Sequence, residues 1–255
     1  MKHKLLAFIL LTFSLTVCGG FVLYSFGAPV WWIIIYAILT VLFNLAYVNF
    51  SYAKGVQIAI KDFNSCDPYP LYEICEKILP YVKGTSGQDI ILNKTSALFW
   101  MGEHEKMLEI LENLNIDKIN GTLLQSKIVY YNNLLCAYQN TGNTDRAIAL
   151  TEKVKILFKD APKKVREQYK SILISAEVFE LQREGKYDEA LKLCLMRPEN
   201  DPLQKISAAM ERAELFIALN EYEKAKTQLK YVYTNGYKTY YVEKAKEMYL
   251  DIDTE

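Results

Sequence analysis

The sequence has few residues suited to metal binding or acid–base catalysis. Among its 255 residues are only two histidines, His3 and His104, and five cysteines without a CxxC pair. Two distant histidines build neither a metal cluster nor a catalytic triad, and scattered cysteines are typical of small apolar packing residues. We therefore predict a protein that is not an enzyme and that uses no cofactor and no metal.

The sequence also lacks an excess of either charge. Thirty Lys and Arg residues balance thirty Asp and Glu residues. Residues 1–50 hold only Lys2 and Lys4 and no acid, so the remaining segment carries 28 bases and 30 acids. A nucleic-acid-binding domain shows a clustered basic face or a high isoelectric point. We therefore expect no nucleic acid among the partners.

Charge is absent from two long runs near the N-terminus. Residues 5–24 and 30–49 are each 20 residues long and contain no charged side chain. A helix of ~20 apolar residues can cross the hydrocarbon core of a bilayer. Gly27 and Pro29 in the short connecting segment favour a turn. The pattern predicts a two-helix transmembrane hairpin over residues 1–50.

The cations beside these runs predict an orientation. Lys2 and Lys4 precede the first run, Lys54 follows the second, and the segment between the runs has no cation. Positively charged flanks stay on the cytoplasmic side of a membrane. We therefore expect a multi-pass protein of the cell membrane, with the lipid bilayer around residues 5–49 and with both termini and the repeat domain in the cytoplasm.

Polar and small residues inside the two runs bear on how the helices pack. Cys18, in "LTVC", resembles the lipidated cysteine of bacterial lipoproteins, but Val17 precedes it where that pattern needs a small residue. The apolar run also continues past Cys18, so we predict no lipidation. Gly19 and Gly20 allow a close approach of the two helices. Asn44 invites a functional role inside the membrane, but we favour a structural one, either a hydrogen bond between the two helices or an amide that extends to the membrane interface.

A segment that recurs four times organises the rest of the chain. Its copies are GEHEKM from Gly102, GNTDRA from Gly142, GKYDEA from Gly185 and NEYEKA from Asn220. Each copy lies between two runs whose apolar residues recur at three- and four-residue steps, which indicates amphipathic helices. Gly or Asn at the start of a copy suits the left-handed conformation that ends a helix. The sequence therefore predicts a series of helix pairs.

A small residue near the end of three copies predicts where the two helices of a pair meet. Ala147, Ala190 and Ala225 occupy equivalent places, and Met107 takes this place in the first copy. A side chain this small lets the second helix press against the first, whereas Met107 suggests a looser first pair.

These copies resemble the tetratricopeptide repeat (TPR) family. GKYDEALKLC contains the Gly-x-Tyr-Asp-Glu-Ala turn of that family, and Tyr131, Leu134 and Tyr138 match its first-helix pattern. The copies start 40, 43 and 35 residues apart, whereas the family repeats at about 34 residues, so some helices or loops must be longer. The resemblance covers residues 86–236 and implies an α-solenoid of TPR-like helix pairs.

The predicted protein is all-α and has four parts. Asp67 and Asp201, each followed by proline, mark helix starts, and the only flexible stretch that we expect is 83–88. The parts are a transmembrane hairpin (1–50), juxtamembrane linking helices (51–85), TPR-like repeats (86–236) and a C-terminal capping helix (237–255).

In the TPR family, the first helices of successive repeats line a concave groove that binds peptides or helices. Members that clamp a terminal carboxylate use Lys, Asn and Arg at places held here by Leu92, Ser96, Ile172 and Ala176, so that clamp is absent. The groove is therefore predicted to be aromatic and amide-lined. The resemblance places these residues in it: Leu92, Ser96, Phe99, Trp100, Asn132, Cys136, Gln139, Asn140, Phe179, Gln182 and Arg183.

Two questions stay open at this point. Phe99 and Trp100 either face a ligand or pack in the core between adjacent repeats. The function is either a membrane-anchored scaffold that docks a protein partner at the cytoplasmic face, or a sensory or regulatory protein whose array binds a peptide. A third alternative is an accessory subunit of a larger membrane complex. An open groove favours docking, whereas a closed array favours peptide binding.

Overall fold

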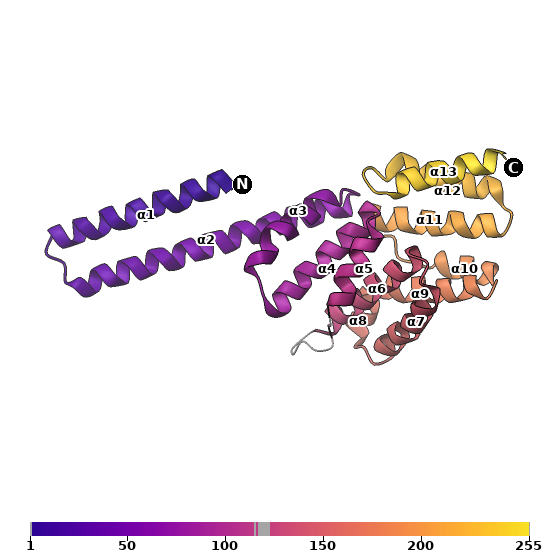
Figure 1. Ribbon diagram of the computed structural model, residues 1–255, viewed down its shortest axis with the longest axis horizontal. Helices are drawn as coiled ribbons and strands as arrows, with labels where there is room; N and C mark the ends of the chain where they lie inside the picture. Colours follow the sequence, from indigo (N-terminus) through magenta and orange to yellow (C-terminus); the bar gives the residue numbers. More distant parts are fainter. Residues whose placement is uncertain (1, 115, 117–122, 255) are drawn as a thin grey trace. The chain divides into compact units, whose positions relative to one another are not determined.

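Helices are the only regular elements in the described part of the chain. This computed structural model describes residues 2–114, 116 and 123–254, and within them it contains α-helices, one short 3-10 helix and no strand (Figure 1). The predicted all-α class is confirmed. The chain divides into two compact units, unit 1 (Met1–Ile58) and unit 2 (Ala59–Glu255), and the division falls within a single long helix.

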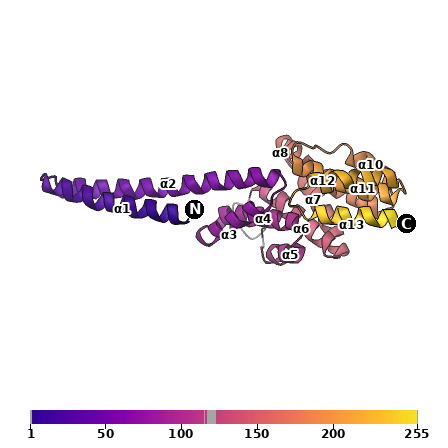
Figure 2. The same cartoon turned by 90° about the horizontal axis from the view of Figure 1, so that it is seen from above.

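Unit 1 is a pair of helices. α1 (Lys2–Ser25) and the first part of α2 (Val30–Asn64) lie side by side in both views (Figures 1 and 2). Residues 26–29 form the turn between them, in which Gly27 has a φ of +72°. The predicted hairpin of helices is confirmed.

Contacts between α1 and α2 involve the small and polar residues of the two runs. A Cβ at Gly19 would lie 2.5 Å from the hydroxyl of Tyr36, so only glycine permits this approach. The hydroxyl of Thr12 donates a 2.6 Å hydrogen bond to Oδ1 of Asn44. The roles predicted for Gly19 and Asn44 are therefore confirmed.

The membrane prediction is wrong. A membrane-spanning helix needs ~20 consecutive and mostly apolar residues. In the residues that the structure describes, no helix is at once long enough and apolar enough to cross a membrane. This finding overturns the predicted spans 5–24 and 30–49, the bilayer around residues 5–49, and the multi-pass location with cytoplasmic termini and repeat domain.

Unit 2 consists largely of helix pairs. The pairs are α4–α5, α6–α7, α9–α10 and α11–α12, and each pair also contacts the next one along the chain. The helices follow one another as α3 (Tyr69–Ile78), η1 (Leu79–Tyr81), α4 (Gly84–Met101), α5 (His104–Asn113), α6 (Leu124–Asn140), α7 (Thr144–Lys159), α8 (Lys163–Gln168), α9 (Lys170–Arg183), α10 (Tyr187–Cys194), α11 (Pro202–Ala218), α12 (Tyr222–Asn235) and α13 (Tyr241–Thr254).

The recurring turns end the first helix of each pair in the predicted way. The φ angles are +79° at Gly102, +74° at Gly142, +71° at Gly185 and +58° at Asn220. This left-handed region is open to glycine at no cost and to asparagine at a small one. The predicted helical repeat is therefore confirmed as a structural feature.

Two other local predictions have opposite outcomes. Asp201 caps α11, because its carboxylate accepts a 2.8 Å hydrogen bond from the backbone N–H of Gln204. The flexible stretch predicted at 83–88 is wrong, because α4 begins at Gly84. The 43-residue interval between the second and third turns contains the short helix α8, which the sequence pattern did not predict.

The small residues of the repeat lie where the helices of each pair touch. Ala147, Ala190 and Ala225 are completely buried, and so is Met107 at the equivalent place of the first pair. Ala147 belongs to the large core that extends from α4 to α9. An interior packed to the density of an organic crystal has no room there for a larger side chain.

We expect Ala147→Leu to destabilise unit 2 by about 1–3 kcal/mol, because added methyl groups overpack a filled core. The melting temperature of the full chain should fall by about 2–12 °C. Ala149, two residues further along α7, is exposed and supplies a matched control: Ala149→Leu adds the same atoms and should leave the melting temperature nearly unchanged. Equal shifts for the two variants would contradict the packing described here.

The end of unit 2 returns to its beginning. The backbone N–H of Tyr240 donates a 3.0 Å hydrogen bond to the carbonyl of Trp100, and the N–H of Lys238 donates one of 3.2 Å to the carbonyl of Cys66. The Lys238 ammonium also lies 2.6 Å from a carboxylate oxygen of Asp67. The array of pairs is thus closed by contacts between the end of α4 and the start of α13.

Candidate functional site

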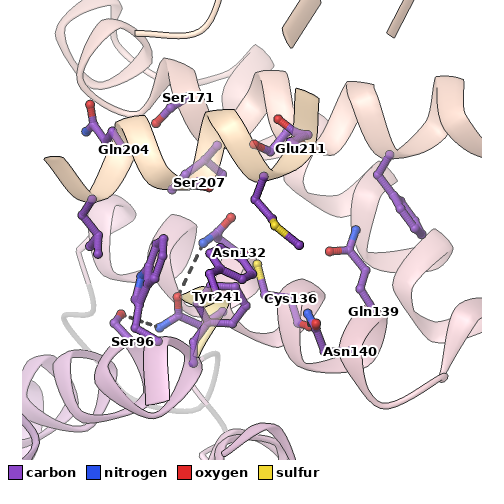
Figure 3. Close-up of a pocket in the computed structure, with 18 of the residues that line it drawn as sticks. Ser96, Asn132, Cys136, Gln139, Asn140, Ser171, Gln204, Ser207, Glu211 and Tyr241 are labelled. Atoms are coloured by element: carbon purple, nitrogen blue, oxygen red, sulfur yellow. Dashed lines mark hydrogen bonds between the residues drawn. The ribbon is translucent and has the colours of Figure 1, made fainter. Parts of the chain in front are cut away.

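A cavity of about 610 Å³ lies on the inner side of this closed array. Its walls come mainly from the first helix of each pair, α4, α6, α9 and α11, together with α13. Figure 3 shows polar side chains from α6, α9 and α11 around it. Cavities of about 300–1,000 Å³ are typical of sites that enclose small ligands.

Most residues that the sequence assigned to a groove line this cavity. They come from three helices that are consecutive first members of pairs. They are Ser96, Phe99, Trp100, Asn132, Cys136, Gln139, Asn140, Phe179 and Gln182. The other two do not line it: Leu92 is only 3% exposed and lies in the core, and Arg183 is exposed near the end of α9.

Several residues of the lining were missed by the sequence analysis. The register of the first three repeats, extended to the fourth, would have found those on α11. The remaining ones become neighbours of the cavity only through the closure of the array. The missed residues include Leu203, Gln204, Ser207, Met210, Glu211 and Glu214 on α11, Tyr241 and Lys244 on α13, and Phe63 and Arg197.

Aromatic side chains form one wall of the cavity and also the closure of the array. The ring centroid of Trp100 lies 5.4 Å from that of Phe99 and 5.2 Å from that of Tyr241, both in edge-on geometry. Trp100 is only 9% exposed and packs with Leu203 and Met210 of α11. Trp100 therefore belongs to the core and to the cavity wall at once, and its contact with a ligand stays a prediction.

A hydrogen-bonded group of small polar residues joins α4 to α6 beside the cavity. The side-chain amide of Asn133 donates to the carbonyl of Leu92 at 3.3 Å and to the hydroxyls of Thr95 and Ser96 at 3.1 and 3.0 Å. Asn132 points into the cavity in Figure 3. Among the described residues, its side chain forms one hydrogen bond, a donation of 3.5 Å to Oδ1 of Asn133. Asn133 is thus a structural residue, whereas Asn132 keeps hydrogen-bonding capacity for a ligand.

Two ion pairs lie in the wall formed by α11. Nη1 of Arg197 lies 2.8 Å from Glu211 Oε2 and also donates a 2.8 Å hydrogen bond to the hydroxyl of Ser175. Nζ of Lys244 lies 2.8 Å from Glu214 Oε1. Burial raises the pKa of Glu211, while the guanidinium of Arg197 opposes this shift.

Cys136 is the thiol that lines the cavity. Burial raises its pKa to about 12, so it is protonated at neutral pH. The thiolate is the reactive form of cysteine, so burial disfavours the reactive form of this side chain. It serves as a small, weakly polar part of the wall.

The comparisons with known proteins do not identify this site. No protein-family model matches the chain, and no curated protein matches its sequence.

Proposed function

We propose that unit 2 is a TPR-like module of a regulatory protein and that its cavity binds a peptide segment. The observation that carries this proposal is the cavity itself, which lies on the face where first helices of successive pairs converge. In the TPR family, that face binds peptides. The proposed activity is binding, with no chemical step.

The closure of the array favours peptide binding over the docking of a large partner. The contact of Tyr240 with the carbonyl of Trp100 brings α13 against the end of α4. A partly open cavity of about 610 Å³ has room for a segment of a few residues rather than for a folded domain. A partner would therefore be recognised through a short stretch of its chain.

The test is a selection of random displayed peptides on the immobilised full-length chain, followed by fluorescence polarisation with the selected peptides. Ser207, half-buried on α11, lines the cavity, whereas Lys205 on the same helix is exposed. Ser207→Phe fills the cavity and should weaken binding by at least about tenfold, which corresponds to about 1.4 kcal/mol. Lys205→Phe is the matched control. A failed selection, or binding that Ser207→Phe leaves intact, would refute the proposal.

A further inference from the structure

The charged side chains of the cavity neutralise one another. The lining contains the bases Arg197 and Lys244 and the acids Glu211 and Glu214. Each base lies 2.8 Å from one of the acids. A charged ligand group loses its hydration when it enters a cavity, and it needs an unpaired opposite charge to compensate. Within the described residues, the lining offers no such charge.

Several amide and hydroxyl groups of the lining have no hydrogen-bond partner among the residues that the structure describes. An amide side chain offers donors and an acceptor side by side. A peptide group also donates and accepts hydrogen bonds, so it matches an amide side chain. A carboxylate only accepts hydrogen bonds and an ammonium group only donates them, so each matches it in part. In the part of the chain that the structure describes, no hydrogen bond is formed by the side chains of Gln139, Gln182, Ser171 and Ser207.

The spacing of these groups suits an extended chain. Asn132 and Gln139 are seven residues apart on α6, which is ~10 Å along a helix. Ser171 and Gln182 are eleven residues apart on α9, which is ~16 Å. An extended polypeptide advances ~3.3 Å per residue. These polar side chains of the lining therefore span about three to five residues of an extended ligand.

The aromatic wall disfavours a sugar as the ligand. Carbohydrate rings need the open face of an aromatic side chain on which to stack. Trp100 is 9% exposed, and Phe99 and Tyr241 pack against it through edge-on contacts. The three rings offer apolar surface to a side chain of the ligand. The indole face of Trp100 is already covered by the protein, so a sugar ring cannot stack on it.

We infer that the ligand of this cavity is an uncharged, internal segment of a polypeptide. Its main-chain amides would pair with the side chains of Gln139 and Gln182 and with the amide oxygen of Asn132, and its apolar side chains would pack on the aromatic wall. A chain terminus is excluded as the preferred ligand, because a terminal carboxylate or ammonium would enter unpaired. The inference rests on the proposed function and narrows it to one chemical class.

The test compares defined ligands on the full-length chain. The probes are pools of peptides of about six residues with acetylated and amidated ends, built from apolar residues with Ser, Thr, Asn and Gln. Parallel pools carry one Asp or Glu, or one Lys or Arg, or a free terminal carboxylate. Chitohexaose and maltohexaose are the saccharide probes. We expect the capped, uncharged pool to bind at least about tenfold more tightly than every other probe.

Two variants test whether the amide side chains of α6 bind the peptide. Asn132→Leu and Gln139→Met keep the size of each side chain and remove its hydrogen bonds, so each should weaken the uncharged pool by about two- to tenfold. Gln125→Met on the same helix α6 lies outside the cavity lining and should have no effect.

The possible outcomes separate this inference from the proposed function. Tightest binding by a charged or carboxylate-ended pool would overturn the inference and leave peptide binding in place. Binding of the uncharged pool that the Asn132 and Gln139 variants do not weaken would also overturn it. Binding of a saccharide alone, or of no probe, would overturn both.

Discussion

Trp100→Ala will lower the melting temperature of the full chain by about 6–20 °C. Truncating a buried tryptophan costs about 3–5 kcal/mol, and each kcal/mol corresponds to about 2–4 °C in a domain of this size. Trp100 is 9% exposed and packs with Leu203, Met210 and Tyr241. The variant therefore loses the contacts that hold α11 and α13 against the end of α4.

The matched control is a tryptophan outside this core. Trp31 is 53% exposed and stacks on Trp32 with a centroid distance of 4.6 Å. Trp31→Ala should cost less than about 1 kcal/mol, because an exposed aromatic pair loses little on truncation.

Hydrogen exchange supplies a local readout of the same prediction. In Trp100→Ala, the amides of α13 should exchange faster than in the unsubstituted chain, because the Tyr240 N–H bond to residue 100 is no longer held by side-chain packing. If α13 stays protected and the melting temperature is unchanged, the array is not closed in solution. The closure of the array would then no longer favour peptide binding over the docking of a large partner.

The helix pairs could be predicted because their signals are local. Gly102, Gly142 and Gly185 stand at turns with positive φ, and the sequence marks these turns by glycine alone. Ala190 is completely buried because its place in the repeat faces the partner helix. Asn132 and Gln139 line the same cavity because they are seven residues apart, which is about two helical turns and places them on one face of α6. This spacing is visible in the sequence.

The closure of the array could not be predicted, because it joins residues that are far apart in the chain. Tyr241 approaches Trp100 only in the folded unit. The sequence around Trp100 gives no signal of a contact with Tyr241, and the sequence around Tyr241 gives none of a contact with Trp100. Arg197 lies between α10 and α11, where no repeat position identifies it as a residue of the cavity. Both residues also take part in contacts that hold the cavity wall together.

Composition predicted the wrong structure in two places. The small and polar residues around Gly87 suggested a flexible stretch, but Gln88 is 2% exposed and a Cβ at Gly87 would lie 3.1 Å from the carbonyl of Val82. Tertiary packing overrides low helix propensity there. The absence of charge from residues 5–24 and 30–49 correctly predicted helices and wrongly predicted membrane spans.

Arg197→Met will destabilise the chain by about 3–5 kcal/mol, because it leaves the carboxylate of Glu211 without its counter-charge in the cavity wall. The side chains of Arg197 and Glu211 are 5% and 18% exposed, so water screens this pair little. The double variant Arg197→Met with Glu211→Met removes both charges and should recover most of the loss. Arg146→Met breaks a pair whose side chains are 62% and 42% exposed and should cost less than about 1 kcal/mol.

The pH dependence of Arg197→Met identifies the unpaired carboxylate as the cause. Burial raises the pKa of Glu211 in the folded chain, and loss of the guanidinium removes the main opposing effect. A folded-state pKa above the unfolded value means that the folded chain binds more protons, so stability falls as pH rises between the two values. The loss of unfolding free energy caused by Arg197→Met, measured by denaturant unfolding, should therefore shrink as pH falls toward about 4.3, the unperturbed pKa of glutamate. A deficit independent of pH would mean that lost packing, rather than the buried charge of Glu211, accounts for the effect.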